Sequence, residues 1–562
     1  MSDDTKRLIL ALLLSGAVML GYGIFFGPGK TQQPPAGQPA QTTQQAAPKA
    51  PAKTPAAKVK PATPTVNPAA GPVAKAKPAR RAARSVAPEV VVENQVAKMF
   101  FSAKGGALRR VELKKYYKHP GKKGGNYILL DLDPAGPLSL SLDLPKADPE
   151  LSDKLFTPSR TGKLEVKPGG ENQLSFSHED GILKVVRTYR FKPDTYTFEL
   201  TVSVTNQGQA PVEFHPELSM AEKPHKEEAN RYAFTGAELM LDGSLEELDT
   251  GDLKDNPVKA GAIRWVTLSI PYFMGAVIPL PDDPTIKRSV RGGATDQLMG
   301  VTLVDPRMRL EPGQQKSFRY QIFYGPRELN LLESVGHDLA KAVDFGWFDI
   351  IAKPLLALLN FLYGFVGNYG VAIIIVTILT KIIFFPLAQK SYKSMKQMQK
   401  LQPQITKIRE KYKHDKQRMN QEIMQLYKTY KVNPMGGCLP MLVQIPVFIA
   451  FYKVLGASIE LRHAPFMLWI NDLSAPDRLW PDLGLPYVGG IPVLTLLMGV
   501  SMFIQQKMTP TMGDPTQAKM MLLMPIVFTV MFINFPSGLV LYWLVQNILG
   551  IAQQYWTNKR KA

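Results

Sequence analysis

The sequence predicts a polytopic α-helical membrane protein that carries one large all-β domain. Apolar runs of bilayer-spanning length occur once near the N-terminus and then crowd into the C-terminal part of the chain. Between them lies a polar stretch in which apolar and polar residues alternate with a period of two, as in half-buried strands. The mean hydropathy of −0.08 is therefore an average over two dissimilar parts.

The N-terminal region predicts an uncleaved anchor and a tether. The apolar run 8–26 is longer than the core of a cleaved signal peptide, so residues 1–29 are expected to remain as the first span. Residues 30–88 are rich in Pro, Ala, Gln and Lys, and they cannot bury enough surface to fold. We expect them to form a disordered, semi-extended linker.

Residues 89–343 are expected to form an antiparallel β-sandwich on the outer side of the membrane. The alternating segments 185–191 and 196–204 flank Lys192-Pro193-Asp194-Thr195, which predicts a hairpin. The histidines of this domain, such as His215 and His225, show no metal-ligand or catalytic spacing.

The rest of the chain supplies five further spans, which makes six in all, with the last five forming a C-terminal core. We expect these spans at 369–387, 434–455, 491–507, 520–535 and 537–555. An interfacial amphipathic helix is expected at 344–368 and a basic cytoplasmic helical hairpin at 388–433. The remaining segments are a periplasmic loop at 456–490, a cytoplasmic loop at 508–519 and a cytoplasmic tail at 556–562.

Charge sets the expected orientation, because short loops rich in lysine and arginine face the cytoplasm. The segment 388–432 has twelve Lys/Arg and three acids, whereas the 456–490 loop has four acids and two arginines. Six spans with both termini inside place every basic loop in the cytoplasm and the β domain outside. If 344–368 also spanned, the basic hairpin would move outside, so this segment is expected to lie in the interface. In the inner membrane of a Gram-negative bacterium, the outer side would be the periplasm.

Lys381 is the one charged residue of its expected span. A lysine at membrane depth costs ~2.5–3.5 kcal/mol on insertion scales, so it either reaches water or belongs to a site. Thr377 lies four residues earlier and shares its helix face. The other spans also carry polar side chains, which could surround a hydrated cavity or serve as hydrogen bonds between helices: Gln444, Gln505, Gln506, Asn534, Trp543, Gln546 and Asn547.

Enzymatic chemistry is not expected. The sequence has no phosphate-binding glycine-rich loop, no HExxH motif, and a single cysteine, Cys438. No histidine falls in an expected span, so an intramembrane serine protease is not expected either. We expect no cofactor and no metal. The net charge of +20 implies acidic partners such as anionic lipid or RNA, without specific DNA binding.

These residues favour a protein that moves polar segments of other proteins into the membrane. A hydrated groove with one positive charge would lower the desolvation penalty of such a segment. Two other classes stay open: a secondary transporter or channel that uses Lys381 as a substrate counter-charge, and a structural scaffold. Transporters usually contain internal repeats, and the five late spans show none.

Three motifs carry a resemblance to a known family: Asn433-Pro434-Met435-Gly436-Gly437-Cys438-Leu439-Pro440 followed by Gln444-Ile445-Pro446, Ala464-Pro465-Phe466-Met467-Leu468-Trp469-Ile470-Asn471-Asp472-Leu473-Ser474, and Phe535-Pro536-Ser537-Gly538-Leu539-Val540-Leu541-Tyr542. The chain resembles the YidC membrane insertases of Gram-negative bacteria over nearly its whole length. The resemblance implies a periplasmic β-supersandwich and a groove open to cytoplasm and lipid. It also implies that the protein inserts, folds and assembles inner-membrane proteins, alone or with the Sec translocon.

The resemblance also implies site residues. The groove arginine of the family falls on Lys381, which keeps the charge but not the planar fork of a guanidinium. The threonine, glutamine and paired aromatic residues of the groove fall on Thr377, Gln506, Tyr542 and Trp543. The implied partners are nascent membrane proteins, the Sec translocon with its accessory subunits, the ribosome and membrane lipid. Client and ribosome contact is expected at nine basic residues: Lys393, Lys396, Lys400, Lys407, Arg409, Lys411, Lys413, Lys416 and Arg418.

Overall fold

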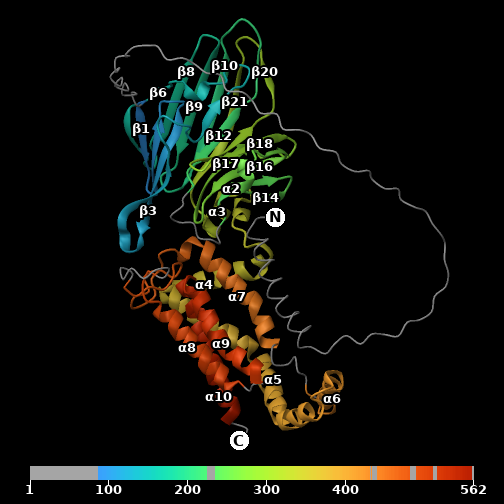
Figure 1. Ribbon diagram of the computed structural model, residues 1–562. Helices are drawn as coiled ribbons and strands as arrows, with labels where there is room; N and C mark the ends of the chain where they lie inside the picture. Colours follow the sequence, from blue (N-terminus) through green and yellow to red (C-terminus); the bar gives the residue numbers. More distant parts are fainter. Residues whose placement is uncertain are drawn as a thin grey trace, which may run out of the picture. The chain divides into compact units, whose positions relative to one another are not determined.

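The computed structural model describes residues 87–224, 234–430, 432, 439–480, 489–509 and 515–559. The expected anchor at 1–29, nearly all of the expected linker at 30–88 and most of the motif at 433–440 lie outside these residues. The described chain is β-rich up to residue 326 and helical after residue 328, as Figure 1 shows.

The β-rich part is built around a nine-stranded sheet. In spatial order its strands are β14 (Ser244–Asp249), β13 (Gly236–Leu241), β16 (Ile263–Ser269), β17 (Phe273–Leu280), β21 (Gln315–Pro326), β10 (Thr197–Asn206), β9 (Leu183–Phe191), β8 (Gln173–Glu179) and β6 (Thr157–Pro158). All its neighbouring strands are antiparallel.

Three smaller sheets accompany it. One contains β4 (Lys123–Asp131), β3 (Ala107–His119), β2 (Ala97–Ser102), β1 (Glu89–Glu93) and β7 (Gly162–Glu165). A second contains β15 (Val258–Gly261), β18 (Arg288–Ala294), β19 (Met299–Val304), β12 (Glu217–Glu222) and β5 (Ser141–Asp143). The third pairs β11 (Val212–Phe214) with β20 (Met308–Leu310). Within these sheets only β1 and β7 pair in parallel.

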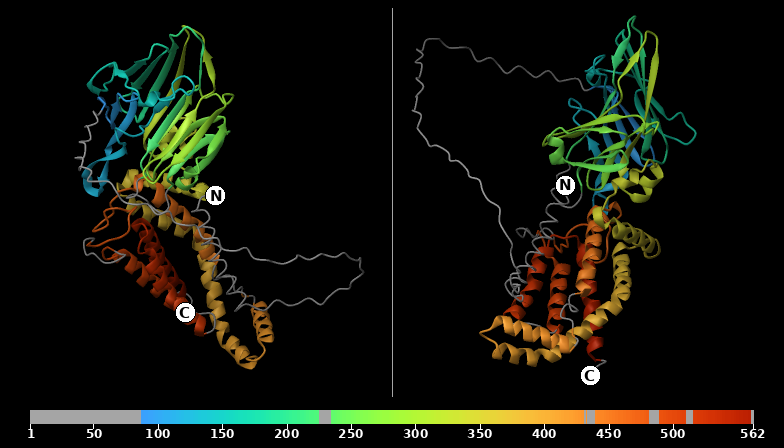
Figure 2. Two further views of the ribbon diagram at one scale, coloured as in Figure 1. Left: turned by 45° about the horizontal axis from the view of Figure 1, so that its top comes forward. Right: turned by 90° about the vertical axis from the view of Figure 1, so that its right-hand side faces the viewer.

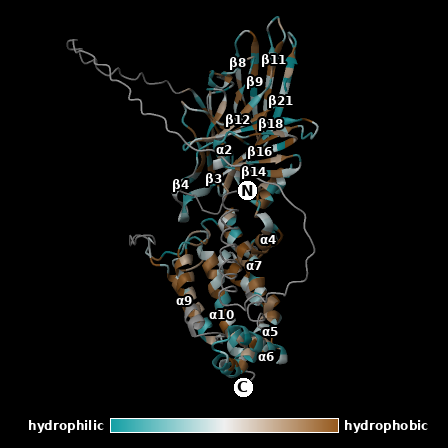
Figure 3. Ribbon diagram, turned by 45° about the vertical axis from the view of Figure 1, so that its right-hand side comes forward, coloured by the Kyte–Doolittle hydropathy of each residue, from teal (hydrophilic) through white to brown (hydrophobic). Residues whose placement is uncertain are grey.

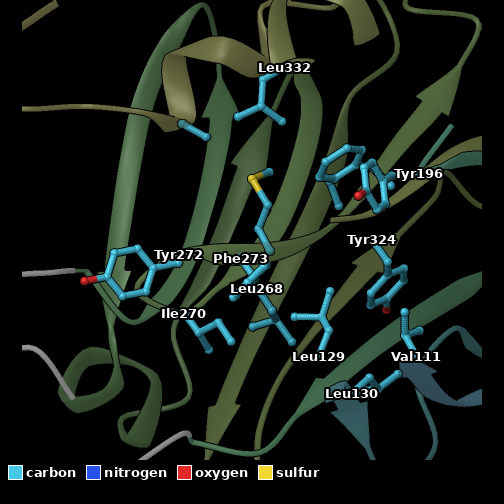
Figure 4. Close-up of a cluster of buried hydrophobic side chains, with 14 of the residues drawn as sticks. Val111, Leu129, Leu130, Tyr196, Leu268, Ile270, Tyr272, Phe273, Tyr324 and Leu332 are labelled. Atoms are coloured by element: carbon cyan, nitrogen blue, oxygen red, sulfur yellow. The ribbon is translucent and has the colours of Figure 1, made fainter. Parts of the chain in front are cut away.

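The hairpin predicted around Lys192–Thr195 is present as β9 and β10, with Phe191 opposite Phe198. Alternate residues of both strands are buried, as a period of two requires. Figure 4 shows where such buried faces meet: Val111 and Leu130 of β3 and β4 approach Leu268, Phe273 and Tyr324 of the nine-stranded sheet. The core of this part therefore lies between sheets and holds them together through apolar contact.

Two short helices come before the long helices of the chain. Helix α2 (Thr250–Lys254) lies within the β-rich part, and α3 (Leu329–Val335) follows its last strand. The long helices are α4 (Asp349–Val366), α5 (Tyr369–Lys411), α6 (Lys416–Thr429), α7 (Leu439–Ala457), α8 (Val493–Met508), α9 (Pro515–Phe532) and α10 (Ser537–Lys559). Short 3-10 turns occupy Pro120–Lys122, Leu151–Asp153, Leu339–Ala342, Gly346–Phe348 and Ile459–Leu461. In Figure 3 the helices α7 and α9 are largely hydrophobic and α6 is hydrophilic.

Helix α5 runs without interruption from the expected span into the expected basic hairpin. The expected helical hairpin bends between the end of α5 at Lys411 and the start of α6 at Lys416, where the Asp415 side chain accepts a hydrogen bond from the Arg418 amide. Figure 2 shows α6 folded back beside the far half of α5. A small apolar cluster joins them: Met398, Leu401, Ile405, Ile423, Leu426 and Tyr427.

Helix α4 is long and apolar enough to cross a membrane by length and composition alone. Its buried residues, such as Ala352 and Leu359, share one face, whereas Ile350 and Phe365 are 83% and 75% exposed. The interfacial placement of residues 344–368 stays a prediction that follows from loop charge.

The packing between α8 and α9 is very close at Gly499. A Cβ atom at this position would lie 2.1 Å from the Thr529 hydroxyl oxygen of α9. Small residues that let helices approach are the usual device of membrane bundles, where the hydrophobic effect does not drive association. The start of α8 is held by Asp477, whose carboxylate accepts hydrogen bonds from the Leu494 amide and the Trp469 indole.

Glu460, in the turn Ile459–Leu461, predicts a pH-dependent stability. Burial, reinforced by the negative charge of Glu328, raises the pKa of Glu460 from 4.5 to about 7. Between these two values the folded chain holds a proton that the unfolded chain releases, so the free energy of unfolding falls as pH rises. We expect Glu460→Gln to remove this slope and to stabilise the protein at pH 8 by on the order of 2–3 kcal/mol.

Thermal unfolding of the full chain in detergent at pH 5 and pH 8 measures this effect. The exposed Glu410 of α5 supplies the matched control, Glu410→Gln. Equal pH dependence of the wild type and the Glu460→Gln variant would contradict the prediction.

Candidate functional site

The apolar first half of α5 places Thr377 and Lys381 one turn apart. Asn368 caps this helix, since its Oδ1 accepts a hydrogen bond from the Val371 amide at 3.1 Å. Thr377 is fully buried, and its hydroxyl donates to the Ile373 carbonyl at 2.6 Å. The Thr377 hydroxyl is thus satisfied within its own helix, in the packed interior rather than on an open surface.

Lys381 lies where α5, α8 and α10 meet. A Cβ atom on Gly550 of α10 would be 3.4 Å from Lys381 Nζ and 2.9 Å from Gln505 Nε2. Both side chains therefore use the space left by the missing side chain of Gly550. The next two residues of α5, Ile382 and Ile383, are 62% and 69% exposed, whereas Lys381 is partly buried. The ammonium group is held at the border between the packed helices and an exposed apolar surface.

The charge of Lys381 is not neutralised within the part of the chain that the structure describes, where it has neither a hydrogen-bond partner nor a carboxylate partner. Gln546 and Gln553 of α10 carry buried side-chain oxygens that also have no donor among the described residues. Helical spacing puts these glutamines on the same face of α10 as Gly550. A cation and two free acceptors along one face are a site for water or a polar segment.

Gln505 of α8 shares the space at Gly550 with Lys381, and it directly precedes Gln506, the residue that the family resemblance favours. Gln506 is partly exposed, and its role in the site stays a prediction. Adjacent residues of a helix point about 100° apart, so the sequence pattern identifies the pair but not the member that faces α10.

Tyr542 and Trp543 of α10 form contacts with other helices. The Tyr542 ring is stacked on Phe451 of α7, with ring centroids 4.4 Å apart, and its hydroxyl is 3.5 Å from Gln444 Nε2. Trp543 contacts Phe448 of α7 and Phe532 of α9, with centroids 4.8 and 4.9 Å apart.

The two aromatic residues do not join Lys381 in one contact cluster. Trp543 is seven residues before Gly550, on the same face of α10 and about 10 Å along the helix from it. The candidate site is therefore elongated along α10. Its charged part lies at Gly550 and its aromatic part about two turns away.

Other polar side chains of the bundle hold helices together. Asn547 of α10 donates to the Ser501 hydroxyl of α8 at 2.9 Å, and both residues are buried. Gln554 of α10 donates to the Met508 carbonyl at 2.7 Å. Asn534 accepts a hydrogen bond from Arg478 at 2.8 Å, which ties the loop before α8 to the end of α9. These polar residues therefore form hydrogen bonds that join helices and loops, which is the second of the two roles considered for them from the sequence.

The nine basic residues expected to contact clients and the ribosome lie in α5, in α6 and between them. Seven are exposed: Lys393, Lys400, Lys407, Lys411, Lys413, Lys416 and Arg418. Lys396 and Arg409 are partly buried. Because the apolar cluster between α5 and α6 faces inward, the hairpin presents a positively charged outer surface.

One group of side chains in the described β-rich part has the composition of a metal site: Asp148, His178 and Asp180, with ligand atoms within 4.8 Å of one another. Lys154 Nζ lies 2.7 Å from the Asp148 carboxylate and 3.9 Å from that of Asp180. This single ammonium group offsets one of the two carboxylate charges and contacts both residues, so we interpret the group as an ion-pair cluster.

Comparisons with known proteins cover nearly the whole chain. The family model of the YidC periplasmic domain matches residues 89–358, and that of the 60Kd inner membrane protein matches residues 361–562. The chain is 43% identical to the membrane protein insertase YidC of Syntrophobacter fumaroxidans over 99% of both chains. It is 42% identical to that of Citrifermentans bemidjiense, again over 99% of both. A crystal structure of an active YidC insertase aligns at 20% identity with a TM-score of 0.37, covering 84% of this chain and 95% of that one.

Proposed function

The chain belongs to the YidC family of membrane protein insertases, and from this premise we propose that it inserts, folds and assembles nascent inner-membrane proteins, alone or with the Sec translocon. The members of this family are inner-membrane proteins with a periplasmic domain. We further propose six spans with both termini in the cytoplasm, and sheets that close into a periplasmic β-supersandwich. Loop charge supports this orientation.

The observation that carries the proposed mechanism is the partly buried, unneutralised ammonium group of Lys381 at the junction of α5, α8 and α10. A polar or acidic segment of a client would form hydrogen bonds there that lipid cannot offer, with Gln505 close to the charge and Gln546 and Gln553 further along the same face of α10. Such a site lowers the desolvation penalty that blocks the segment from crossing. Thr377, Gln506, Tyr542 and Trp543 are proposed to complete the groove, Thr377 by packing behind the charged residue.

A separate surface of this protein, on α9, is suited to the apolar part of a client. Helix α9 exposes a set of flexible and branched apolar side chains: Met521, Leu522, Leu523, Met524, Ile526, Val527, Val530 and Met531. Methionine adapts to apolar partners of different shapes. A client helix of ~20 apolar residues could pass along this surface into lipid without fuel, because its burial is downhill.

The positively charged outer surface of the α5–α6 hairpin supports contact with the ribosome and with incoming clients. Its exposed lysines and arginines have the charge needed to attract RNA and anionic lipid. We propose the Sec translocon and its accessory subunits as further partners on the strength of family membership.

Reconstitution tests the proposed activity. The purified full chain in liposomes with no other protein should protect the translocated segment of a small newly made membrane protein from external protease. Protection should exceed that in empty liposomes. A correctly folded sample without any protection would overturn autonomous insertion.

A further inference from the structure

A polar cavity of about 320 Å³ lies between α5, α8 and α10, apart from the Lys381 site. We call it the two-lysine cavity. It is lined by Tyr392, Met395, Lys396 and Gln399 of α5, by Lys507, Met508 and Thr509 at the end of α8, and by Gln554 of α10. Lys396 lies 15 residues after Lys381 along α5, or about 22 Å of helix, so the two sites are separate.

The cavity brings together two cations without an anion. Neither Lys396 nor Lys507 has a carboxylate partner among the described residues, and the lining contains no acidic side chain. Lys396 is partly buried and Lys507 is exposed, and both side chains line the same cavity. Two like charges at one cavity repel each other. A bound anion would remove the repulsion. The hydroxyl groups of Tyr392 and Thr509 add polar groups of the kind that bind phosphate oxygens.

The surface that leads to the cavity is apolar. Leu496, Val500, Phe503 and Ile504 of α8 are 48%, 57%, 40% and 44% exposed. Their spacing puts them on one face that ends at Lys507, whose Nζ lies 5.5 Å from the Phe503 ring centroid. An anion bound at the cavity can therefore continue into an apolar chain that lies along α8.

Aromatic side chains mark the depth of the cavity in the membrane. Gln554 lines it, and the next two residues of α10, Tyr555 and Trp556, are 61% and 41% exposed. Exposed tyrosine and tryptophan residues at helix ends gather at the headgroup level of a bilayer. The cavity thus combines positive charge, a position at headgroup depth and an adjacent exposed apolar face of α8. A ligand that fits all three is an amphiphile with an anionic head.

We propose that the two-lysine cavity binds the phosphate of an anionic phospholipid headgroup, with the acyl chains lying along the exposed face of α8. Basic pockets between helices at the membrane interface are suited to such headgroups. The site requires only that the chain lies in a membrane and does not depend on the proposed insertion activity.

Native mass spectrometry of the full chain, titrated with phosphatidylglycerol in detergent, tests the site. The double variant Lys396→Gln/Lys507→Gln should bind phosphatidylglycerol about tenfold or more weakly than the wild type. The matched control is Lys393→Gln/Lys400→Gln, which removes the same charge from exposed positions of α5 outside the cavity. Thermal unfolding of each variant checks that it is folded.

The control double variant should bind phosphatidylglycerol like the wild type, and phosphatidylcholine binding should not change in either variant. Equal weakening by both double variants would show that the overall charge of the hairpin binds the lipid, which overturns the proposal. Displacement of the lipid by millimolar glycerol 3-phosphate would identify a soluble phosphate ester as the ligand and would overturn the lipid assignment.

Discussion

Replacing Lys381 by alanine is expected to lower the insertion of a client with an acidic translocated segment by about tenfold or more, because a charge pair at the edge of the helices is worth several times the ~1.4 kcal/mol of a tenfold change. Lys381→Arg should retain most of the activity, since it keeps the charge. The measurement is protease protection of the client in liposomes that contain the purified variant.

A second client and a second lysine make this prediction specific. A client whose translocated segment has no acidic residue should be inserted by Lys381→Ala nearly as well as by the wild type. Lys453 of α7 is also partly buried in an apolar helix, so Lys453→Ala is the control for loss of a lysine in the bundle. If Lys381→Ala inserted the acidic client like the wild type, the charge would have no part in insertion, and a scaffold role would gain support.

Replacing Arg187 by leucine is expected to destabilise the β-rich part by about 2–4 kcal/mol. Arg187 of β9 is fully buried, and its guanidinium donates to the carbonyl oxygens of Gly105 and Leu140. Leucine would leave both buried carbonyls without donors, and each unsatisfied group costs about 1–3 kcal/mol. Removal of a buried charge offsets only part of this loss.

The expected change is a fall in melting temperature of about 5–15 °C for a domain of this size. It is measured on the full chain in detergent by the temperature at which the β-rich part becomes sensitive to protease. Arg190, on the same strand but exposed, provides the matched control, Arg190→Leu. Unchanged protease resistance in Arg187→Leu would show that the two carbonyls find other donors.

Some of the candidate site could be read from sequence alone. Lys381 stands out because it interrupts an apolar run, and no other part of the chain is needed to notice it. Thr377 follows from helical spacing. The role of Gly550 could not be predicted from the sequence, because a glycine in an apolar segment has no reactive or charged group. Its role is to leave room for two side chains from other helices.

The burial of Arg187 could not be predicted from the sequence either. An arginine in an alternating strand is usually exposed, and the alternation of apolar residues around it predicts only which face is buried. Its two carbonyl partners lie 82 and 47 residues away along the chain, so no local pattern reveals them.

The sequence by itself determined what depends on local pattern: membrane-spanning length, strand alternation, the hairpin at residues 192–195, and the family, through motifs that need no structure to be recognised. Only the tertiary structure decided that Gln505 and Lys381 meet at Gly550, that the Thr377 hydroxyl is used within its own helix, and that Lys396 and Lys507 share one cavity. The physical reason is that spacing along a helix fixes the direction of a side chain relative to its own axis, whereas the rotation and contacts of each helix are set by packing against the others.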